Sequence, residues 1–245
     1  MSHNLHYVNY ETNLSMLIAK KNTLLNSETM PKPTYYWDFR KSLVDEVNHH
    51  VASAYGSYSK TADGIRLHGT YGEYISLGSN LLNTDERGLT ISVVSARHAS
   101  NEWSRCFDFG SGTTNYIMMA WNGEDYNIQV SSLKFKNMEW NNFGMSSSSI
   151  DYVNDTFIRF TVSISNDNGN DWNAVYYLHG LDGQLLSYVR CDCSKQWGNW
   201  KLSAYSFPYM YLGKSLYEAD SFTDATYRSA ALYDVPLAAE QIAAL

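Results

Sequence analysis

The sequence predicts an all-β sandwich, and its hydrophobic period, its composition and the order of its elements each favour that class. From residue 34 onward, apolar side chains recur at every second position, which is the period of a strand. Aromatic residues make up 15% of the chain, and their side chains suit the pleated, half-buried surface of a sheet. Many short strands before a single brief helix indicate a sandwich, because an α/β fold alternates helices with strands.

Individual segments carry the strand pattern clearly. Apolar and polar side chains alternate along residues 157–165 (FIRFTVSIS), which predicts a strand with one buried and one solvated face. Residues 89–94 (LTISVV) alternate in the same way. Residues 116–121 (YIMMAW) are apolar on both faces and are expected to form an interior strand. An Asp-Gly pair at residues 182–183 separates two further apolar runs and predicts a hairpin, because Gly accepts the positive φ that the turn requires.

Both ends of the chain depart from this pattern. Residues 236–245 (PLAAEQIAAL) predict a short helix with Pro in its first turn. Near-helical spacing of apolar residues over 10–25 predicts an amphipathic helix, and the prolines at 31 and 33 end it. Residues 1–33 are therefore interpreted as an arm and residues 34–245 as the sandwich. The apolar stripe of the arm consists of Leu14, Leu17, Ile18, Leu24 and Leu25. This stripe packs either on its own sandwich or on a partner within a larger assembly.

Charge and cysteine content exclude some classes of partner. The formal net charge is -7, and no basic patch stands out, so no nucleic-acid partner is expected. No apolar stretch of 18 residues is present, so no membrane insertion is expected. The first ten residues lack the features of a secretory signal, which favours folding in the cytoplasm. The odd number of cysteines (Cys106, Cys191 and Cys193) favours reduced thiols.

A series of short motifs follows one another in a characteristic order. They are residues 37–40 (WDFR), 63–67 (DGIRL), 74–78 (YISLG), 89–93 (LTISV), 105–112 (RCFDFGSG), 115–117 (NYI), 211–215 (YLGKS) and 227–245. Over about residues 35–245, this order resembles the laminin G-like branch of the concanavalin A-like lectin/glucanase superfamily. The resemblance implies a jelly roll of two stacked antiparallel sheets, with residues 63–67 and 74–78 as paired strands. It implies fold more firmly than activity, because lectins, adhesion modules, glycanases and virion proteins share this sandwich.

The sequence lacks the catalytic pattern of the glucanases in that superfamily. Those enzymes carry Glu-x-Asp-x-x-Glu on one strand, and the nearest match is Glu218-Ala219-Asp220, with Thr223 in the place of the second Glu. Glu218 is therefore interpreted as a loop carboxylate, and no enzymatic activity is expected. The seven histidines show no metal-ligand spacing, so no cofactor is expected, although calcium stays open. Asp108 pairs with Arg105 or caps a turn, or it binds an ion or a sugar hydroxyl.

Aromatic side chains are the candidate ligand-binding groups, because they stack on apolar sugar faces and anchor protein contacts. Five tryptophans lie in Asn-, Gly- or Ser-rich surroundings that indicate the rims of the sandwich: Trp103, Trp140, Trp172, Trp197 and Trp200. The alternative for each is partial burial under a loop. Trp37 and Trp121 lie within strand patterns and are expected in the core.

These observations favour a non-enzymatic recognition and structural module. One version is a bacteriophage virion protein, a capsid decoration or tail component that attaches through its arm and reaches the virion surface after cytoplasmic assembly. The alternative is a carbohydrate-binding or adhesion lectin domain on a bacterial surface or outside the cell. Either version allows glycans as ligands. A glycanase with an unrecognised site is the third hypothesis.

Overall fold

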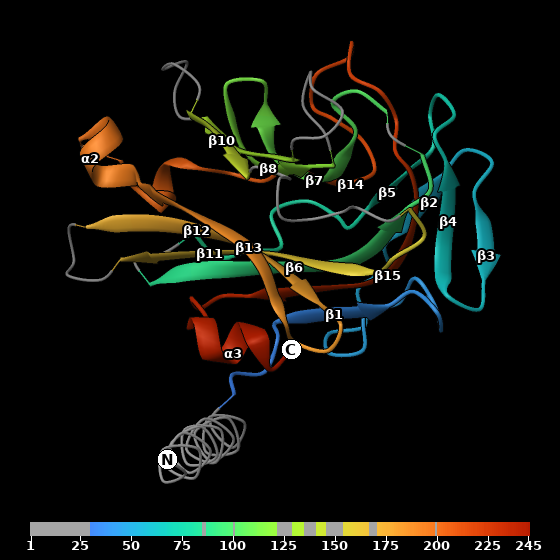
Figure 1. The fold of residues 1–245 in the computed structure, drawn as a ribbon, viewed down its shortest axis with the longest axis horizontal. Helices are drawn as coiled ribbons and strands as arrows, with labels where there is room; N and C mark the ends of the chain where they lie inside the picture. Colours follow the sequence, from blue (N-terminus) through green and yellow to red (C-terminus); the bar gives the residue numbers. More distant parts are fainter. Residues whose placement is uncertain are drawn as a thin grey trace, which may run out of the picture.

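Two antiparallel sheets stack as two layers in the computed structural model of the chain (Figure 1). The structure describes residues 30–84, 87–99, 101–121, 129–134, 141–145, 154–166, 171–198 and 200–245. The predicted all-β sandwich is confirmed. The helix predicted over residues 10–25, with its stripe of Leu14, Leu17, Ile18, Leu24 and Leu25, lies outside the described residues. The boundary between arm and sandwich at residue 33 stays a prediction.

The larger sheet contains eight of the described strands. Seven of them follow the order β13-β12-β11-β6-β15-β4-β3, and β1 also pairs with β15. Neighbouring strands in this sheet run antiparallel, as expected for a sandwich. The strands are β1 (Tyr35–Asp38), β3 (Ser59–Thr61), β4 (Gly64–His68), β6 (Gly88–Arg97), β11 (Ile158–Asn166), β12 (Trp172–Gly180), β13 (Leu185–Asp192) and β15 (Asp224–Tyr233).

The smaller sheet contains the other seven described strands, in the order β10-β9-β8-β7-β14-β5-β2. The strand predicted at residues 116–121 is β8, which lies between β7 and β9, so its interior position is confirmed. The strands are β2 (Ser53–Tyr55), β5 (Tyr74–Ser76), β7 (Arg105–Gly112), β8 (Asn115–Ala120), β9 (Gln129–Lys134), β10 (Asn141–Met145) and β14 (Tyr209–Leu212).

The expectation that residues 63–67 and 74–78 form paired strands is wrong. Strand β4 belongs to the larger sheet and pairs with β3 and β15, whereas β5 belongs to the smaller sheet and pairs with β2 and β14. Gly69 and Gly72, at φ 73° and 84°, lie in the short connection between β4 and β5. Each strand sends its apolar side chains into the core from its own sheet. The apolar pattern of the two motifs therefore does not reveal that the chain passes from one sheet to the other between them.

The core fills the space between the two layers. Trp37 and Trp121 are 0% and 1% exposed, which confirms their predicted core positions. The three cysteines are free and buried, as expected for reduced thiols. Cys106 lies in the main cluster, and the Sγ atoms of Cys191 and Cys193 lie 3.8 Å apart.

The prediction that one face of residues 157–165 is solvated is wrong. In β11, the outward residues Arg159, Thr161 and Ser163 are buried, and the C-terminal segment packs on the outer face of the larger sheet (Figure 1). Ser163 Oγ donates to the carbonyl oxygen of Leu237 at 2.9 Å. Thr90 Oγ1 accepts from the amide of Leu237 at 2.8 Å. These bonds allow polar strand residues to be buried without losing their partners.

Short helical segments and one hairpin complete the described part of the chain. The helices are α2 (Cys193–Trp197), α3 (Ala239–Ala243) and the 3-10 turn η2 (Leu202–Ala204). Helix α3 confirms the predicted C-terminal helix and buries Ile242 against the outer face of the larger sheet. The predicted Asp-Gly hairpin joins β12 to β13, with Gly183 at φ 83°.

Candidate functional site

Four tyrosines form a continuous row on the outer face of the smaller sheet. In β14, Met210 and Leu212 point into the core with 0% exposure, so the alternating Tyr209 and Tyr211 point outward. Tyr55 and Tyr74 are directly opposite each other in β2 and β5, and their rings stack with centroids 4.5 Å apart. The Tyr74 ring meets the Tyr211 ring at 5.1 Å, and the Tyr211 ring meets the Tyr209 ring at 5.7 Å. We call Tyr55, Tyr74, Tyr211 and Tyr209 the tyrosine ladder.

The ammonium group of Lys214 lies over the middle of the ladder. Lys214 Nζ is 4.5 Å from the ring centroid of Tyr74 and 4.8 Å from that of Tyr211. Both distances fit cation–π contacts, which hold the ammonium group against the aromatic surface. The preceding Gly213 has φ 79°, and a Cβ there would lie 2.4 Å from Leu67 Cδ1. The turn that brings Lys214 over the ladder therefore requires glycine.

Residues 213–223, between β14 and β15, form one wall of the site, and Arg105 anchors them. Its Nη2 donates to Asp220 Oδ2 at 2.5 Å, and its Nε donates to Asp108 Oδ2 at 3.3 Å. Asp108 Oδ2 also accepts the amide of Leu216 at 3.0 Å. Ser215 Oγ donates to Asp220 Oδ2 at 2.7 Å. Because both carboxylates bind the same guanidinium and loop groups, the wall is fixed to β7.

Asp108 has a structural position rather than a ligand-facing one. It is 0% exposed, and the structure confirms its pairing with Arg105. Burial raises the pKa of the Asp108 carboxyl to about 6, although the Arg105 charge acts in the opposite direction. The Oδ1 atom accepts no hydrogen bond from the described residues. Asp108 therefore supports residues 213–223 from below.

Three tyrosines of the ladder (Tyr74, Tyr211 and Tyr209) and the loop line an open cavity of about 550 Å³. The aromatic cleft, as we name it, is lined by Tyr71, Tyr74, Tyr209, Tyr211, Lys214 and Phe222 among others. Tyr71 lies at the edge of the cleft and is 88% exposed, and the centroids of the Tyr71 and Phe222 rings are 5.3 Å apart. Partial burial raises the pKa of Tyr211 to about 12, so its hydroxyl group is protonated at neutral pH. The cleft thus offers flat apolar faces with hydroxyl and ammonium donors around them, within the size range of small-ligand pockets.

Two of the five predicted rim tryptophans belong to the core instead. Trp172 is 5% exposed and Trp200 is 1% exposed, and their ring centroids lie 5.4 Å apart. The Trp200 Nε1 atom donates to the Tyr205 hydroxyl at 3.1 Å. Their prediction as rim residues is wrong, because polar neighbours in sequence do not keep a large aromatic side chain out of the core when tertiary packing covers it.

The other three predicted tryptophans have separate positions. Trp103 is partly buried, and its backbone has a φ of 52°. Its side chain packs against Tyr116, Met118 and Ala120. The Arg105 guanidinium lies 5.6 Å from the centroid of its ring. Trp140 lies outside the described residues. Trp197 ends helix α2, and only its backbone is described. None of the tryptophans whose side chains are described lines the aromatic cleft. The alternation of residues 209–212 (YMYL) was the sequence signal that could have pointed to the tyrosines instead.

The remaining candidate groups are the possible metal ligands and Glu218. No group of three or more His, Cys, Asp or Glu side chains there is placed to hold a metal ion. Glu218 is exposed in the loop between β14 and β15, which confirms its interpretation as a loop carboxylate. Within the described ranges, every helix is too short or too polar to cross a membrane.

Comparison with known proteins relates the chain to others by fold. No protein-family model matches the sequence, and no curated protein matches it either. Among solved structures, it is similar to domain 4 of AbnA, a GH43 extracellular arabinanase from Geobacillus stearothermophilus, in complex with arabinotriose. The TM-score is 0.58 at 14% identity, over 86% of this chain and 97% of that one.

Two neurotoxin structures are similar to the same degree. The binding domain of botulinum neurotoxin serotype D/C aligns with a TM-score of 0.59 at 13% identity, over 86% of this chain and 50% of that one. Botulinum neurotoxin type C, which depends on interaction with two ganglioside molecules to enter cells, aligns with a TM-score of 0.59 at 15% identity, over 90% and 51%. The chain therefore spans about half of these neurotoxin structures. At such identities the similarity shows a shared fold alone.

Proposed function

We propose that the protein is a non-enzymatic, lectin-like module that binds an oligosaccharide in the aromatic cleft. The observation that carries this proposal is the tyrosine ladder with Lys214 above it, on an otherwise regular sheet face. Sugar rings have apolar C–H faces that stack on aromatic rings, and hydroxyl groups that need donors and acceptors at the edges. Tyr74 and Tyr211 supply the stacking faces, while Lys214 Nζ supplies a donor that is already held in place.

The known ligands of the structural neighbours agree with this class of ligand. The AbnA domain was solved with arabinotriose, and botulinum neurotoxin type C interacts with gangliosides, which are glycolipids. A cavity of about 550 Å³ has room for more than one sugar ring. At the level of family, we propose that the sandwich belongs to the laminin G-like branch that the motif order over about residues 35–245 resembles.

The absence of catalysis is part of the proposal. Glycoside hydrolysis requires two carboxyl groups on either side of the scissile bond. Of the two carboxylates lining the cleft, Asp220 is bound by Arg105 and Ser215, and Glu218 is exposed on the loop. We expect no reducing ends to be released from a panel of polysaccharides. Hydrolysis that disappears in Glu218→Gln would contradict this part of the proposal.

Binding to sugars is tested with matched tyrosine variants. The wild-type protein is screened against immobilised neutral and acidic glycans, and the strongest ligand is then measured by calorimetry. Tyr74→Ala and Tyr211→Ala are each expected to weaken binding about 30-fold, which corresponds to about 2 kcal/mol for a central aromatic contact. The control is Tyr188→Ala, because Tyr188 is 62% exposed but lies on β13 of the other sheet. Equal affinity in all four proteins, or no glycan binding at all, would refute the proposal.

Attachment to a larger assembly is a finer proposal that rests on sequence features. We propose that residues 1–33 dock the module on a phage particle through Leu14, Leu17, Ile18, Leu24 and Leu25 and present it on the virion surface. Deletion of residues 1–33 is expected to leave a folded sandwich that binds glycans but no longer joins the particle. Unfolding or aggregation of the truncated protein would instead show that the arm belongs to the core.

A further inference from the structure

The outer face of the larger sheet contains a second cavity, of about 270 Å³. Its floor consists of small side chains on the two central strands, since Ser92 and Val94 of β6 are directly opposite Ala231 and Ser229 of β15. The larger side chains of Tyr36, Arg159 and Tyr233 surround this floor. We name this cavity the arginine hollow and define it by Tyr36, Arg40, Arg159, Arg228, Ser229 and Tyr233.

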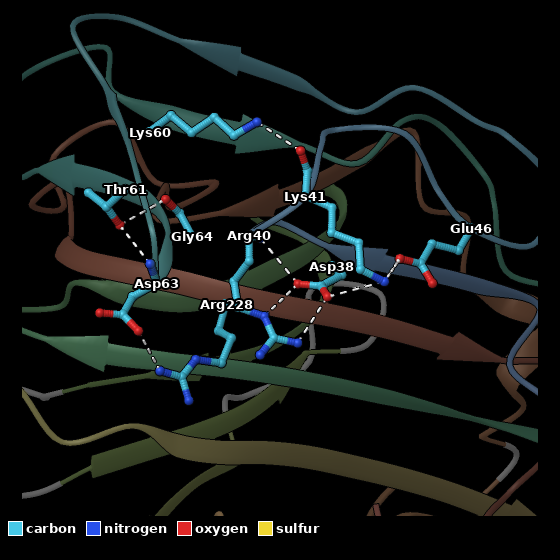
Figure 2. A network of polar contacts seen from close by, with 9 residues as sticks. All are labelled: Asp38, Arg40, Lys41, Glu46, Lys60, Thr61, Asp63, Gly64 and Arg228. Carbon is cyan, nitrogen blue, oxygen red and sulfur yellow. Dashed lines mark hydrogen bonds and ion pairs between the residues drawn. The ribbon is translucent and has the colours of Figure 1, made fainter.

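Two of the three arginines that line the hollow are already paired. Arg40 binds Asp38 through two hydrogen bonds, from Nε at 2.8 Å and from Nη2 at 2.9 Å. Arg228 Nη2 donates to Asp63 Oδ1 at 2.8 Å, and its guanidinium lies 3.7 Å from the Phe157 ring centroid. Figure 2 shows both pairs, in which Asp38 contacts the Arg40 guanidinium and Asp63 contacts that of Arg228. Bidentate and stacked arginines of this kind are rigid donors.

Arg159 differs from these two, because no Asp or Glu side chain among the described residues pairs with it. It is 8% exposed, and its Nη1 atom is buried without any hydrogen-bond acceptor. Its direct neighbours across the sheet are Val94 on β6 and His179 on β12, and neither supplies an anion. Burial lowers the pKa of Arg159, yet a guanidinium stays charged at neutral pH. A buried charge without a partner is costly, so the site is set up for an anion that offsets it.

We propose that the arginine hollow binds a small oxyanion, the carboxylate, sulfate or phosphate group of a small ligand, with Arg159 as its principal contact. The side chains of Tyr36 and Tyr233 line the same cavity, and their hydroxyl groups complete the set of donors. Burial raises the pKa of Tyr233 to about 12, so that hydroxyl keeps its proton at neutral pH. No Asp or Glu side chain lines the hollow among the described residues. The hollow lies on the other sheet from the aromatic cleft and is independent of the function proposed for the cleft.

The proposal is tested by calorimetric titration of the full chain with sodium sulfate, inorganic phosphate and glucuronate at constant ionic strength. Saturable binding of at least one of them is expected, and the strongest identifies the oxyanion. Arg159→Met is expected to weaken that binding at least tenfold. The matched control is Lys60→Met, which removes the same charge from an exposed position on β3 of the same sheet and is expected to bind like the wild type.

Two further variants keep the result unambiguous. Ser229→Leu fills the floor of the hollow while leaving Arg159 in place, and it is expected to abolish binding as well. Tyr74→Ala alters only the aromatic cleft and is expected to leave anion binding unchanged, which separates this proposal from the glycan proposal. The absence of saturable binding for all three anions would overturn the inference. Equal binding by the Arg159→Met and wild-type proteins, or an equal loss in Lys60→Met, would also overturn it.

Discussion

Replacement of Asp108 by Asn allows the contribution of the buried carboxyl group beneath the aromatic cleft to the free energy of unfolding to be measured. Asp108 Oδ2 accepts from Arg105 Nε and from the amide of Leu216, and Oδ1 accepts nothing from the described residues. An Asn side chain keeps one acceptor oxygen for these donors but cannot ionise. The substitution therefore removes a titrating group while it retains the shape of the site.

The magnitude follows from the pKa of Asp108, which is raised from 3.8 to about 6 by burial. Because the folded state binds this proton more tightly than the unfolded chain, the stabilising contribution is fully present below about pH 4 and is lost as the pH rises through about 6. Two pKa units correspond to about 3 kcal/mol. The free energy of unfolding of the wild type, relative to that of Asp108→Asn, is expected to fall by about that amount between pH 4 and pH 7.

The measurement is denaturant-induced unfolding of both proteins at intervals between pH 4 and pH 7, followed by tryptophan fluorescence. The dependence of the unfolding free energy on denaturant concentration should be the same in the two proteins, which shows that the same transition is compared. If the two stability curves run parallel over this pH range, the Asp108 carboxyl is not destabilised in its ionised form, and the argument from burial is wrong.

Three other perturbations have outcomes that follow from the packing. Trp200→Ala is expected to lower the free energy of unfolding by about 3–5 kcal/mol in a denaturant titration, because the side chain is 1% exposed. The control Tyr71→Ala should change the free energy of unfolding by less than about 0.5 kcal/mol, because Tyr71 is 88% exposed. Gly213→Ala is expected to destabilise the fold by more than about 1 kcal/mol and to weaken glycan binding as strongly as Lys214→Ala, since an added Cβ meets Leu67 at 2.4 Å. A reductant should move the melting temperature by less than about 2 °C, because all three cysteines are free thiols. A large loss of stability in Tyr71→Ala, unaltered binding in Gly213→Ala, or a marked shift with reductant would each contradict the corresponding argument.

Local pattern was sufficient to predict the strands that lie in the middle of a sheet. Strands β6, β8 and β11 are long, and their side chains follow the pattern of buried strands, so the predicted segments fall within the observed strands or within a residue or two of their bounds. The Asp-Gly turn was predictable for the same reason, since its geometry depends on Gly183 alone. The burial of the outer face was not predictable, because Ser163 of β11 finds its partner in Leu237, which is 74 residues away along the chain.

The sequence by itself determined the all-β class, the free state of the thiols and the core positions of Trp37 and Trp121. These properties depend on the period and on the composition of short segments. The tyrosine ladder was decided only by tertiary structure, because strands β2, β5 and β14 bring Tyr55, Tyr74 and Tyr211 together from positions up to 156 residues apart. The burial of Trp200 and the position of Arg159 in the arginine hollow were also decided only by tertiary structure. Packing between segments that are distant in sequence determines which side chains are covered and which line a cavity.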